Sequence, residues 1–561
     1  MDDFIKKLKP IFKGDIADDA ETLDAYSRDA SLFEVKPNLV VFPKDAGDVK
    51  NLVKLVNESN KKGERFSLTA RSAGTDMTGG PLTESIVVSF TKHFNHIKEI
   101  KGIPLQNNSD IAGYAVVEPG VFYRDFEKET LKHNLLLPSY PASRELCAIG
   151  GIVANNSGGE KTLIYGKTEK YVEEIKMVLS DGEEYTFKPL TLKEFAQKEK
   201  AKGREGEIYK KLHTLIDKNY DVLQAAKPKV SKNSSGYFLW NVWDKERGIF
   251  DITKVIVGSQ GTFGIITEVK FALVRPKKFS RLLVIFLKDT KMLPSLINHV
   301  LAFKPESFES YDDHTFKIAM KLLPDVIKKL GGNAIILGLK FIPELWMTLT
   351  GGIPKLVMMA EFTADTPEEA EKKAMEAEKS LEEFHLKTEV TRTAGSAQKY
   401  WVIRRESFNM LRHHIHGMRT APFIDDLIVS PDKLPAFFPR LYGILDTYDI
   451  IYTVAGHMGD GNFHIIPLMD LSKPGQKELI NELAHKVYDL IAEFKGSITA
   501  EHNDGLIRTP YLEKMYGKKI CKLFYETKRI FDPKNIFNPG KKVGGSFEYA
   551  MKHIDAKSGS K

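Results

Sequence analysis

Short apolar runs and helical apolar stripes alternate through the first part of the chain. The stripe formed by Val49, Leu52 and Val56 predicts a helix over residues 46–60. The other predicted elements here are strands over residues 38–43, 66–70, 85–90 and 115–120 and a helix over residues 121–133. This β-α-β order predicts a mixed α/β domain.

The pattern changes after residue 275. Predicted strands at 282–287, 334–339 and 356–361 alternate with predicted helices at 293–302, 367–386 and 398–412. We therefore expect an α+β cap domain. The helix at 367–386 is dense in Glu and Lys four residues apart, which is typical of a solvated face.

These patterns divide the chain into five predicted parts. They are an N-terminal helical segment (1–35), a first domain (36–275), a cap with the candidate chemistry (276–505), a helical segment that packs back on the first domain (506–545) and a tail (546–561). The polar end of the tail, from Lys552 onward, is expected to be disordered.

The stretch from Val454 to Pro467 predicts a β-hairpin. Its centre, Gly459–Asn462, contains two glycines that supply the positive φ values of a tight turn. A four-residue loop there places His457 opposite His464 on one face. Opposed residues have Cβ atoms about 5 Å apart, a separation at which two imidazoles can bind one metal ion.

Two histidines alone are as compatible with a structural hairpin, in which the buried rings bond to backbone groups, as with a metal site. Glu501 and His502, which follow the apolar run 498–500, add a carboxylate and a third imidazole. Two histidines and one carboxylate leave open positions on a divalent ion, as catalytic metals require. The residues therefore favour a metal site over a purely structural hairpin.

Composition narrows the class of protein. A net charge of +7 is small against 82 basic and 75 acidic residues, and the lysines are scattered, so we expect no nucleic-acid partner. Two cysteines can form neither a disulfide framework nor an iron–sulfur cluster.

The N-terminus has no signal-peptide pattern, and the longest apolar stretch, near 335–360, is interrupted by charges and prolines. We expect a cytoplasmic protein, with room for a peripheral contact at the inner membrane face.

The sequence contains three glycine-rich tracts, at residues 71–80, 148–159 and 258–268. The first directly follows a predicted strand, and the third is joined to a β-rich run. Small residues let the backbone approach a ligand, and such amide nests suit a pyrophosphate. A structural turn is the alternative for any single tract. No G-x-G-x-x-G nicotinamide fingerprint occurs in the chain.

Together, the three tracts resemble the flavin-binding domain of the vanillyl-alcohol oxidase/p-cresol methylhydroxylase superfamily, in order from Pro37 to about Val274. The resemblance implies FAD, with its pyrophosphate on the first tract and its isoalloxazine along the second. Covalent members often carry a histidine in the first tract, where this chain has Gly74 and Thr75, so we expect non-covalent FAD. The implied cofactor-binding residues are Arg71, Ser72, Ala73, Gly74, Thr75, Asp76, Thr78, Gly79, Pro138, Ser143, Gly150, Gly151, Ala154, Asn156, Ser157, Ile265 and Ile266.

The second part resembles the C-terminal domain of FAD-linked oxidases such as D-lactate, glycolate and D-2-hydroxyglutarate dehydrogenases. The matching motifs are 456–464, 501–505 with Arg508, and 538–541. The implied fold class is α+β, a two-subdomain flavin-binding domain of the p-cresol methylhydroxylase type plus an α+β cap.

The resemblance also assigns roles. His457, His464 and Glu501 would hold a divalent metal, zinc or manganese. His502 would be the catalytic base and would also contact the substrate. The other predicted substrate-binding residues are Asn462 and Arg404, the arginine of the Trp-x-x-Arg motif.

The implied reaction is oxidation of a D-2-hydroxy acid to the 2-oxo acid. The hydroxyl and a carboxylate oxygen would chelate the metal, His502 would take the hydroxyl proton, and the C2 hydride would pass to flavin N5. Because the chain has neither a nicotinamide fingerprint nor a cysteine cluster, electrons would leave to a quinone, a cytochrome, a carrier flavoprotein, an iron–sulfur subunit or oxygen.

Two departures from the family pattern affect the prediction. Asn503 stands where relatives usually have glycine, and residues 423–426 lack the lysine that grips a second carboxylate in 2-hydroxyglutarate enzymes. The missing lysine favours a D-lactate-like monocarboxylate. One alternative is a non-catalytic flavin-binding subunit. Another is an ether-lipid synthase, an enzyme class in which a His-rich segment is expected. In this chain the only such segment is His413, His414 and His416, on a charged predicted helix.

Overall fold

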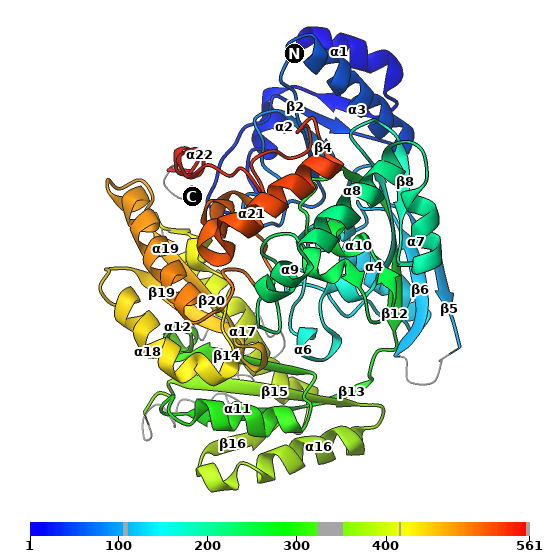
Figure 1. Cartoon of the computed structure of the whole chain (residues 1–561). Coiled ribbons are helices and arrows are strands. Elements are labelled where there is room, and N and C mark those ends of the chain that lie inside the picture. The colour runs from blue at the N-terminus through cyan, green and yellow to red at the C-terminus, as the bar shows by residue number, and fades with distance from the viewer. Residues whose placement is uncertain (105–109, 322–351, 415–416, 557–561) are drawn as a thin grey trace.

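The structure is a computed structural model that describes residues 1–104, 110–321, 352–414 and 417–556. Figure 1 shows two halves joined side by side: residues up to about 275 form one, and a large sheet with its helices forms the other. The predicted strand at 334–339 and most of the apolar stretch at 335–360 lie outside the described residues.

The first half begins with a four-stranded sheet of order β1-β2-β4-β3. Parallel strands β2 (Leu39–Phe42), β4 (Ile86–Ser89) and β3 (Leu68–Arg71) follow the predicted β-α-β pattern, with helix α3 (Ala46–Lys61) as the crossover. Val49, Leu52, Val53 and Val56 of α3 are fully buried, as the apolar stripe predicts. Strand β1 (Asp15–Ala17) lies within the segment predicted to be helical, between α1 (Asp2–Leu8) and α2 (Ala20–Ala25).

A five-stranded antiparallel sheet completes the first half, in the order β5-β6-β12-β7-β8. Its strands are β5 (Ile97–Gly102), β6 (Ile111–Val117), β12 (Ile265–Val274), β7 (Val172–Val178) and β8 (Glu184–Phe187). Helices α4 (Tyr123–Lys132), α5 (Ile149–Asn155), α7 (Leu192–Glu199), α8 (Arg204–Lys218), α9 (Tyr220–Ala226) and α10 (Thr253–Ile256) accompany it, together with the short strands β9 (Leu190–Thr191), β10 (Trp243–Asp244) and β11 (Ile249–Phe250). One apolar core joins this sheet to its helices.

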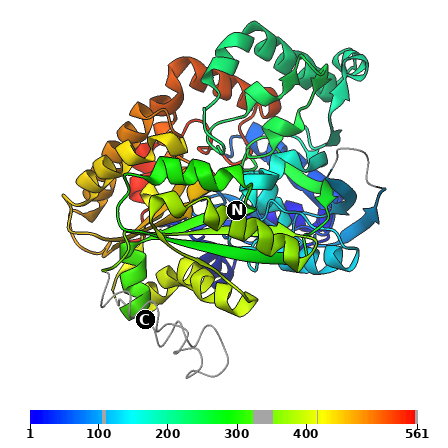
Figure 2. The same ribbon diagram turned by 90° about the horizontal axis from the view of Figure 1, so that it is seen from below.

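The second half is an eight-stranded antiparallel sheet of order β16-β13-β15-β14-β19-β20-β17, with β18 also paired to β20. The strands are β13 (Phe279–Leu287), β14 (Ser307–Asp312), β15 (Leu356–Ala364), β16 (Lys387–Val390), β17 (Arg419–Thr420), β18 (Leu427–Ile428), β19 (Ile451–His457) and β20 (Asn462–Met469). Helices α11 (Leu293–Ala302), α16 (Pro367–Lys379), α18 (Leu434–Leu445) and α19 (Gln476–Glu493) share one core with one face of the sheet. Helices α12 (Asp313–Lys321) and α17 (Ala394–His414) pack on the other face, as Figure 2 shows from below. Both faces of the sheet are thus covered, which explains the continuous apolar runs in β13 and β15.

The chain then returns to the first half through α20 (Gly505–Arg508) and α21 (Leu512–Phe531). The N–H of Leu68 donates to O of Ile536 (2.7 Å), and the N–H of Asn538 donates to O of Leu68 (2.9 Å), so the C-terminal part extends the edge of the first sheet.

The tail is partly ordered, contrary to the prediction. After α22 (Phe547–Lys552), Ile554 forms a bridge with Phe33, and Asp555 is 4% exposed. Nε of Arg28 lies 3.0 Å from the Asp555 carboxylate, which also pairs with Arg419. Composition misled the prediction because these few residues are buried by partners far away in the sequence.

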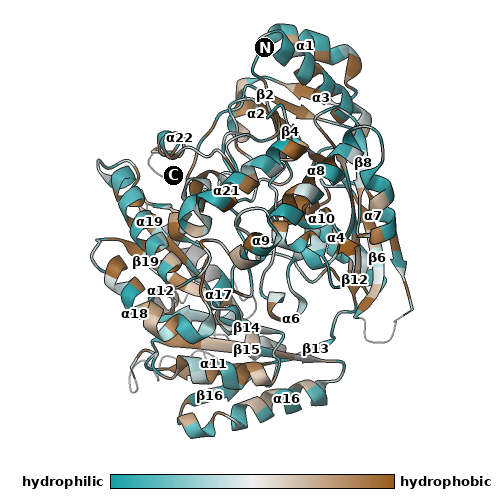
Figure 3. Cartoon of the chain, viewed as in Figure 1, coloured by the Kyte–Doolittle hydropathy of each residue, from teal (hydrophilic) through white to brown (hydrophobic). Residues whose placement is uncertain are grey.

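Helix α16 is mostly hydrophilic in Figure 3, and its buried residues are the alanines Ala370, Ala374 and Ala377. Among the helices that the structure describes, none is both long and apolar enough to cross a lipid bilayer.

Candidate active site

A cavity of about 740 Å³ lies between the glycine-rich tracts of the first half and the strands β19 and β20 of the second. The predicted cofactor-binding residues on its wall are Arg71, Ser72, Ala73, Gly74, Thr75, Asp76, Ser143, Gly150, Gly151, Ala154, Ser157 and Ile266. The opposite wall includes Arg404, His457, His464, Glu501 and His502. Two groups of residues predicted from separate motifs therefore share one cavity.

Five predicted cofactor-binding residues do not line this cavity: Thr78, Gly79, Pro138, Asn156 and Ile265. Oγ1 of Thr78 donates to Asp76 (2.7 Å), and the N–H of Gly79 donates to Asp29 (3.0 Å), so both shape the first tract from behind. Asn156 ends α5 in a left-handed conformation with φ +49°, and its Oδ1 accepts from the N–H of Glu169 (2.9 Å).

The first tract fits a pyrophosphate. Within the described chain, no backbone N–H of residues 72–77 donates to another protein group. Gly74 has φ +69°, and a Cβ there would meet the Arg71 guanidinium at 2.3 Å. At Gly150 a Cβ would meet Oγ of Ser72 at 2.6 Å. Free amides and glycines at close approaches are what a phosphate-binding loop needs.

The predicted hairpin is confirmed, but its register differs. His457 opposes Asn462 and His464 opposes Ala455, because the four-residue loop is Met458–Gly461, one position earlier than predicted. Moving the loop by one position shifts the pairing by two residues and keeps both histidines on one face. Their ring centroids are 5.4 Å apart, so diagonal neighbours still meet.

A buried carboxylate holds each histidine of the hairpin by Nδ1. Nδ1 of His457 lies 2.5 Å from Glu309 of β14, and Nδ1 of His464 lies 3.1 Å from Asp425. This arrangement fixes the tautomer and leaves each Nε2 available as a metal ligand. Sequence reasoning missed both carboxylates.

His502 joins the same carboxylate. Its Nδ1 lies 2.7 Å from Oδ2 of Asp425, and its ring stacks on His464 with centroids 5.1 Å apart. Burial opposes a charge on His502, but Asp426 and Asp425 outweigh it and raise its pKa to about 9. A divalent cation held by the neighbouring His464 and Glu501 would oppose that extra proton.

Glu501 is buried beside a cation. Nζ of Lys232 lies 2.7 Å from Oε1 of Glu501 and 3.0 Å from Asp460. The other oxygen, Oε2, lies 3.5 Å from Nε2 of His457. Despite burial, Lys232 and His457 hold the pKa of Glu501 well below its usual range. Oε2 is therefore an ionised oxygen that faces the hairpin histidines.

Asp426 completes the group. Ligand atoms of Asp426, His464, Glu501 and His502 all lie within 4.8 Å of one another. The Asp426 carboxylate already accepts from Thr499, from the N–H groups of Glu501 and His502 and from Asn462. Oδ2 accepts three of these bonds and Oδ1 only one, so Asp426 holds the loop through Oδ2 and keeps Oδ1 as a candidate ligand atom. His457, the other predicted metal ligand, is not among these four residues, although its Nε2 lies 3.5 Å from Oε2 of Glu501. Two imidazoles and one carboxylate are donors that suit a divalent ion such as zinc or manganese.

The two predicted substrate-binding residues of the cap differ in position. Arg404 lines the cavity 3.2 Å from Glu309, and its buried Nε has no hydrogen-bond partner in the described chain. Asn462 is 1% exposed and does not line the cavity; Nδ2 donates to Asp426 (3.1 Å) and to O of Leu427 (3.0 Å). Its substrate contact stays a prediction.

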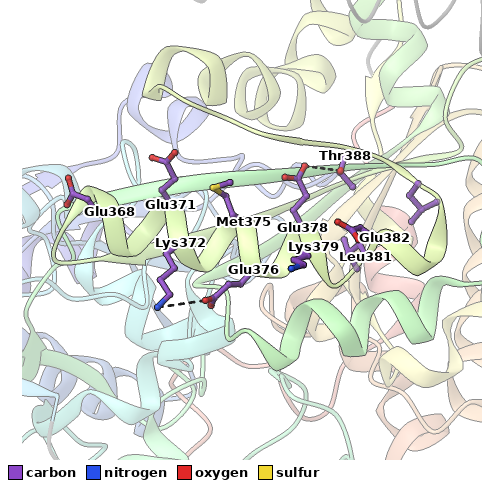
Figure 4. A pocket seen from close by; sticks show the side chains of 11 residues that line it. Glu368, Glu371, Lys372, Met375, Glu376, Glu378, Lys379, Leu381, Glu382 and Thr388 are labelled. Carbon is purple, nitrogen blue, oxygen red and sulfur yellow. Dashed lines mark hydrogen bonds and ion pairs between the residues drawn. The ribbon is translucent and has the colours of Figure 1, made fainter.

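Figure 4 shows a second hollow, on the outer face of α16. Its rim carries Glu368, Glu371 and Lys372, and Lys372 pairs with Glu376 (3.9 Å). Charged pairs one turn apart on an exposed helix agree with the predicted solvated face.

Two parts of the chain match known families. Residues 37–188 match the family described as FAD binding domain, and residues 278–542 match FAD linked oxidases, C-terminal domain. The chain belongs to the FAD-linked oxidases. The family predicted from the motifs is thereby confirmed.

This FAD-linked oxidase is 27% identical over 538 residues to the D-2-hydroxyglutarate dehydrogenase of Pseudomonas putida, an alignment that covers 94% of the chain and 50% of that protein. It is 26% identical over 528 residues to the D-lactate dehydrogenase of Archaeoglobus fulgidus, covering 93% and 96%. The chain spans about half the length of the first of these relatives. The solved structure of p-cresol methylhydroxylase matches with a TM-score of 0.65 at 14% identity, over 96% of each chain, and confirms the predicted fold class.

Proposed function

We propose that this protein is an FAD- and metal-dependent dehydrogenase that oxidises a small D-2-hydroxy acid, D-lactate-like, to the 2-oxo acid. The observation that carries the proposal is the position of His457, His464, Glu501 and His502 on the wall of the cavity that the flavin tracts also line. The names of the relatives, D-2-hydroxyglutarate and D-lactate dehydrogenases, support the reaction class.

His457, His464 and Glu501 are the proposed metal-holding residues. Glu309 and Asp425 occupy Nδ1 of the two rings, so Nε2 of each ring and Oε2 of Glu501 are the available donor atoms. A divalent cation, when bound there, supplies Lewis acidity that lowers the pKa of an alcohol.

His502 is the proposed base. Its Nδ1 forms an ion pair with Asp425 (2.7 Å), so Nε2 is the ring nitrogen that would accept the hydroxyl proton of the substrate. FAD, when bound, supplies the acceptor for the two electrons that leave C2. The two carboxylates beside the base are shielded from water, since Glu501 is 6% exposed and Asp425 is fully buried, whereas the His502 side chain is 25% exposed.

Arg404 is the proposed partner of the substrate carboxylate. Five arginines and no lysine line the cavity among the described residues. Arg28 and Arg419 pair with Asp555, and Arg405 pairs with Glu160. Arg71 donates to backbone carbonyls of Tyr26 and Arg28. Arg404 pairs with Glu309 through one nitrogen and keeps its buried Nε without a hydrogen-bond partner among the described residues. The free Nε of Arg404 is the donor that we assign to the single carboxylate of a monocarboxylic acid.

An anaerobic titration tests the function. FAD-loaded protein is mixed separately with D-lactate, glycolate, D-2-hydroxyglutarate and longer 2-hydroxy acids, and the absorbance of oxidised flavin is followed. We expect one acid to bleach the flavin, with D-lactate faster than D-2-hydroxyglutarate. Absence of bleaching by every acid, with flavin and metal both bound, would instead support the non-catalytic flavin-binding subunit.

Metal removal tests the second cofactor. A chelator should abolish bleaching while leaving FAD bound, and added Zn²⁺ or Mn²⁺ should restore it. Full activity in metal-free protein would overturn the metal role.

The proposed electron acceptor is a separate quinone, cytochrome, carrier flavoprotein or iron–sulfur subunit. Each can be added to the reduced flavin in the same assay and compared as a re-oxidant. The predicted cytoplasmic position, with peripheral contact at the inner membrane face, belongs to this proposal.

A further inference from the structure

Asn503 lies between the Glu501–His502 pair and the flavin tracts. Its side chain is fully buried. Nδ2 donates to O of Gly258 (2.9 Å) and lies 3.4 Å from O of Ala154, while Oδ1 accepts from Nζ of Lys542 (2.6 Å). The amide group therefore links two flavin-binding tracts and the C-terminal segment at one point.

The backbone of Asn503 is equally constrained. Its φ of +75° is in the left-handed region, which asparagine tolerates better than most residues. The N–H donates to Oγ1 of Thr499 (2.9 Å), and the carbonyl accepts from Arg508 (3.1 Å). A glycine, as the family resemblance predicts here, would permit this backbone and could make none of the side-chain contacts.

The residues on either side of Asn503 are anchored to different halves. The N–H groups of Glu501 and His502 donate to Asp426 of the cap (2.8 and 2.7 Å). The N–H of Gly505 donates to Oε1 of Gln260 (2.8 Å), which belongs to the third flavin tract. Asn503 thus lies where the loop leaves the cap and joins the flavin half.

We propose that Asn503 is a positioning residue that fixes Glu501 and His502 at a set distance from the flavin tracts. It acts through the loop and touches no reacting atom. The inference rests on the proposed function for its effect on catalysis, but its effect on the loop is independent of the substrate. A loop held by fewer contacts samples more positions, and small misplacements of a metal ligand or a base are costly.

Three variants separate positioning from folding. Asn503→Gly keeps the left-handed backbone and removes the amide. Asn503→Asp keeps the shape and the Lys542 contact and removes the two donated hydrogen bonds. Asn535→Gly is the matched control, because Asn535 is also left-handed (φ +52°) but exposed.

Each variant is loaded with FAD and compared with the unchanged protein by three measurements. They are the melting temperature, the Kd for Mn²⁺, and amide hydrogen exchange of residues 499–505. For both Asn503 variants we expect a Kd raised about tenfold or more and faster exchange at Glu501 and His502, with FAD content unchanged. The control Asn535→Gly should change neither the Kd for Mn²⁺ nor the exchange at Glu501 and His502. With an acid that bleaches the flavin, the reduction rate should fall by a similar factor.

Two results would overturn the inference. One is a Kd and an exchange pattern in Asn503→Gly equal to those of the unchanged protein. The other is a lower melting temperature with both properties intact, which would show a merely structural role. If no acid bleaches even the unchanged protein, the proposed function fails while the Mn²⁺ and exchange data still decide the role of Asn503.

Discussion

Asp425 contacts His502 and His464 together: Oδ2 lies 2.7 Å from Nδ1 of His502, and Oδ1 lies 3.1 Å from Nδ1 of His464. One fully buried carboxylate thus contacts a proposed base and a proposed metal ligand. It accepts a hydrogen bond from His464, whereas its contact with His502 is an ion pair without hydrogen-bond geometry. Such partners are known to matter nearly as much as the ligands that they orient.

Replacing Asp425 by asparagine should disturb both rings. The amide can accept from one Nδ1–H, but its NH₂ group faces the other as a second donor. We expect metal affinity and the rate of flavin reduction to fall by about 10- to 100-fold. Metal titration and stopped-flow absorbance measure the two effects. Asp446→Asn, which alters only a contact with Tyr452, is the control; unchanged affinity in Asp425→Asn would contradict the orienting role.

Removal of His502 should separate binding from chemistry. His502→Ala retains the flavin tracts and the three proposed metal-holding residues, so FAD and metal should bind normally. Loss of a general base should slow flavin reduction by about 10²- to 10⁴-fold. His299→Ala, at a histidine that lies on α11 away from the cavity, should reduce its flavin at the normal rate. Normal reduction in His502→Ala would remove this residue from the mechanism.

Both cysteines should be unreactive in the folded protein. Burial raises the pKa of Cys147 and of Cys521 to about 12. At pH 8 the thiolate, which is the reactive form, is then only about 10⁻⁴ of each thiol. An aromatic disulfide reagent should release its chromophore slowly from native protein and rapidly, at two equivalents per chain, after denaturation. Fast reaction of either thiol in FAD-loaded protein would disagree with this burial.

Lys541 should make stability depend on pH in alkaline solution. Burial lowers the pKa of Lys541 to about 8, against about 10.4 in an unfolded chain. Between those values the unfolded chain binds more protons, so the free energy of unfolding gains up to about 3 kcal/mol as pH rises through this window. Below pH 8 that stability is missing.

The measurement for Lys541 is a comparison of variants. Denaturant unfolding of the unchanged protein and of Lys541→Met at pH 7 to 10.5 should show a difference that changes with pH in the stated direction. The lost hydrogen bond to O of Leu82 adds a constant and leaves the slope untouched. A difference independent of pH would mean that Lys541 keeps its ordinary pKa.

Local patterns were sufficient to predict much of the site. The two glycines of the hairpin loop and the neighbouring apolar residues specified the turn, and the period of a strand kept His457 and His464 on one face although the register differed. Glu501 and His502 end an apolar run, and the structure places them on the same cavity wall.

The charged residues that support the site, Glu309, Asp425 and Lys232, could not be predicted in the same way. Glu309 lies 148 residues from His457 in the sequence, and Lys232 lies 269 residues from Glu501. No periodicity connects residues so far apart, because their contact depends on how the sheet of the cap meets the flavin half. The Asp425–Asp426 pair beside an apolar strand was a visible signal that the sequence alone could not connect to a histidine.

The pairing of Leu68 with residues 536 and 538 has a consequence for how this protein can be divided. A gene fragment that ends near residue 275 would encode β3 with β4 on one side and nothing on the other, leaving a strand edge open to aggregation. The first sheet is complete only after the last part of the chain has been synthesised. We therefore expect such a fragment to aggregate more readily than the whole chain.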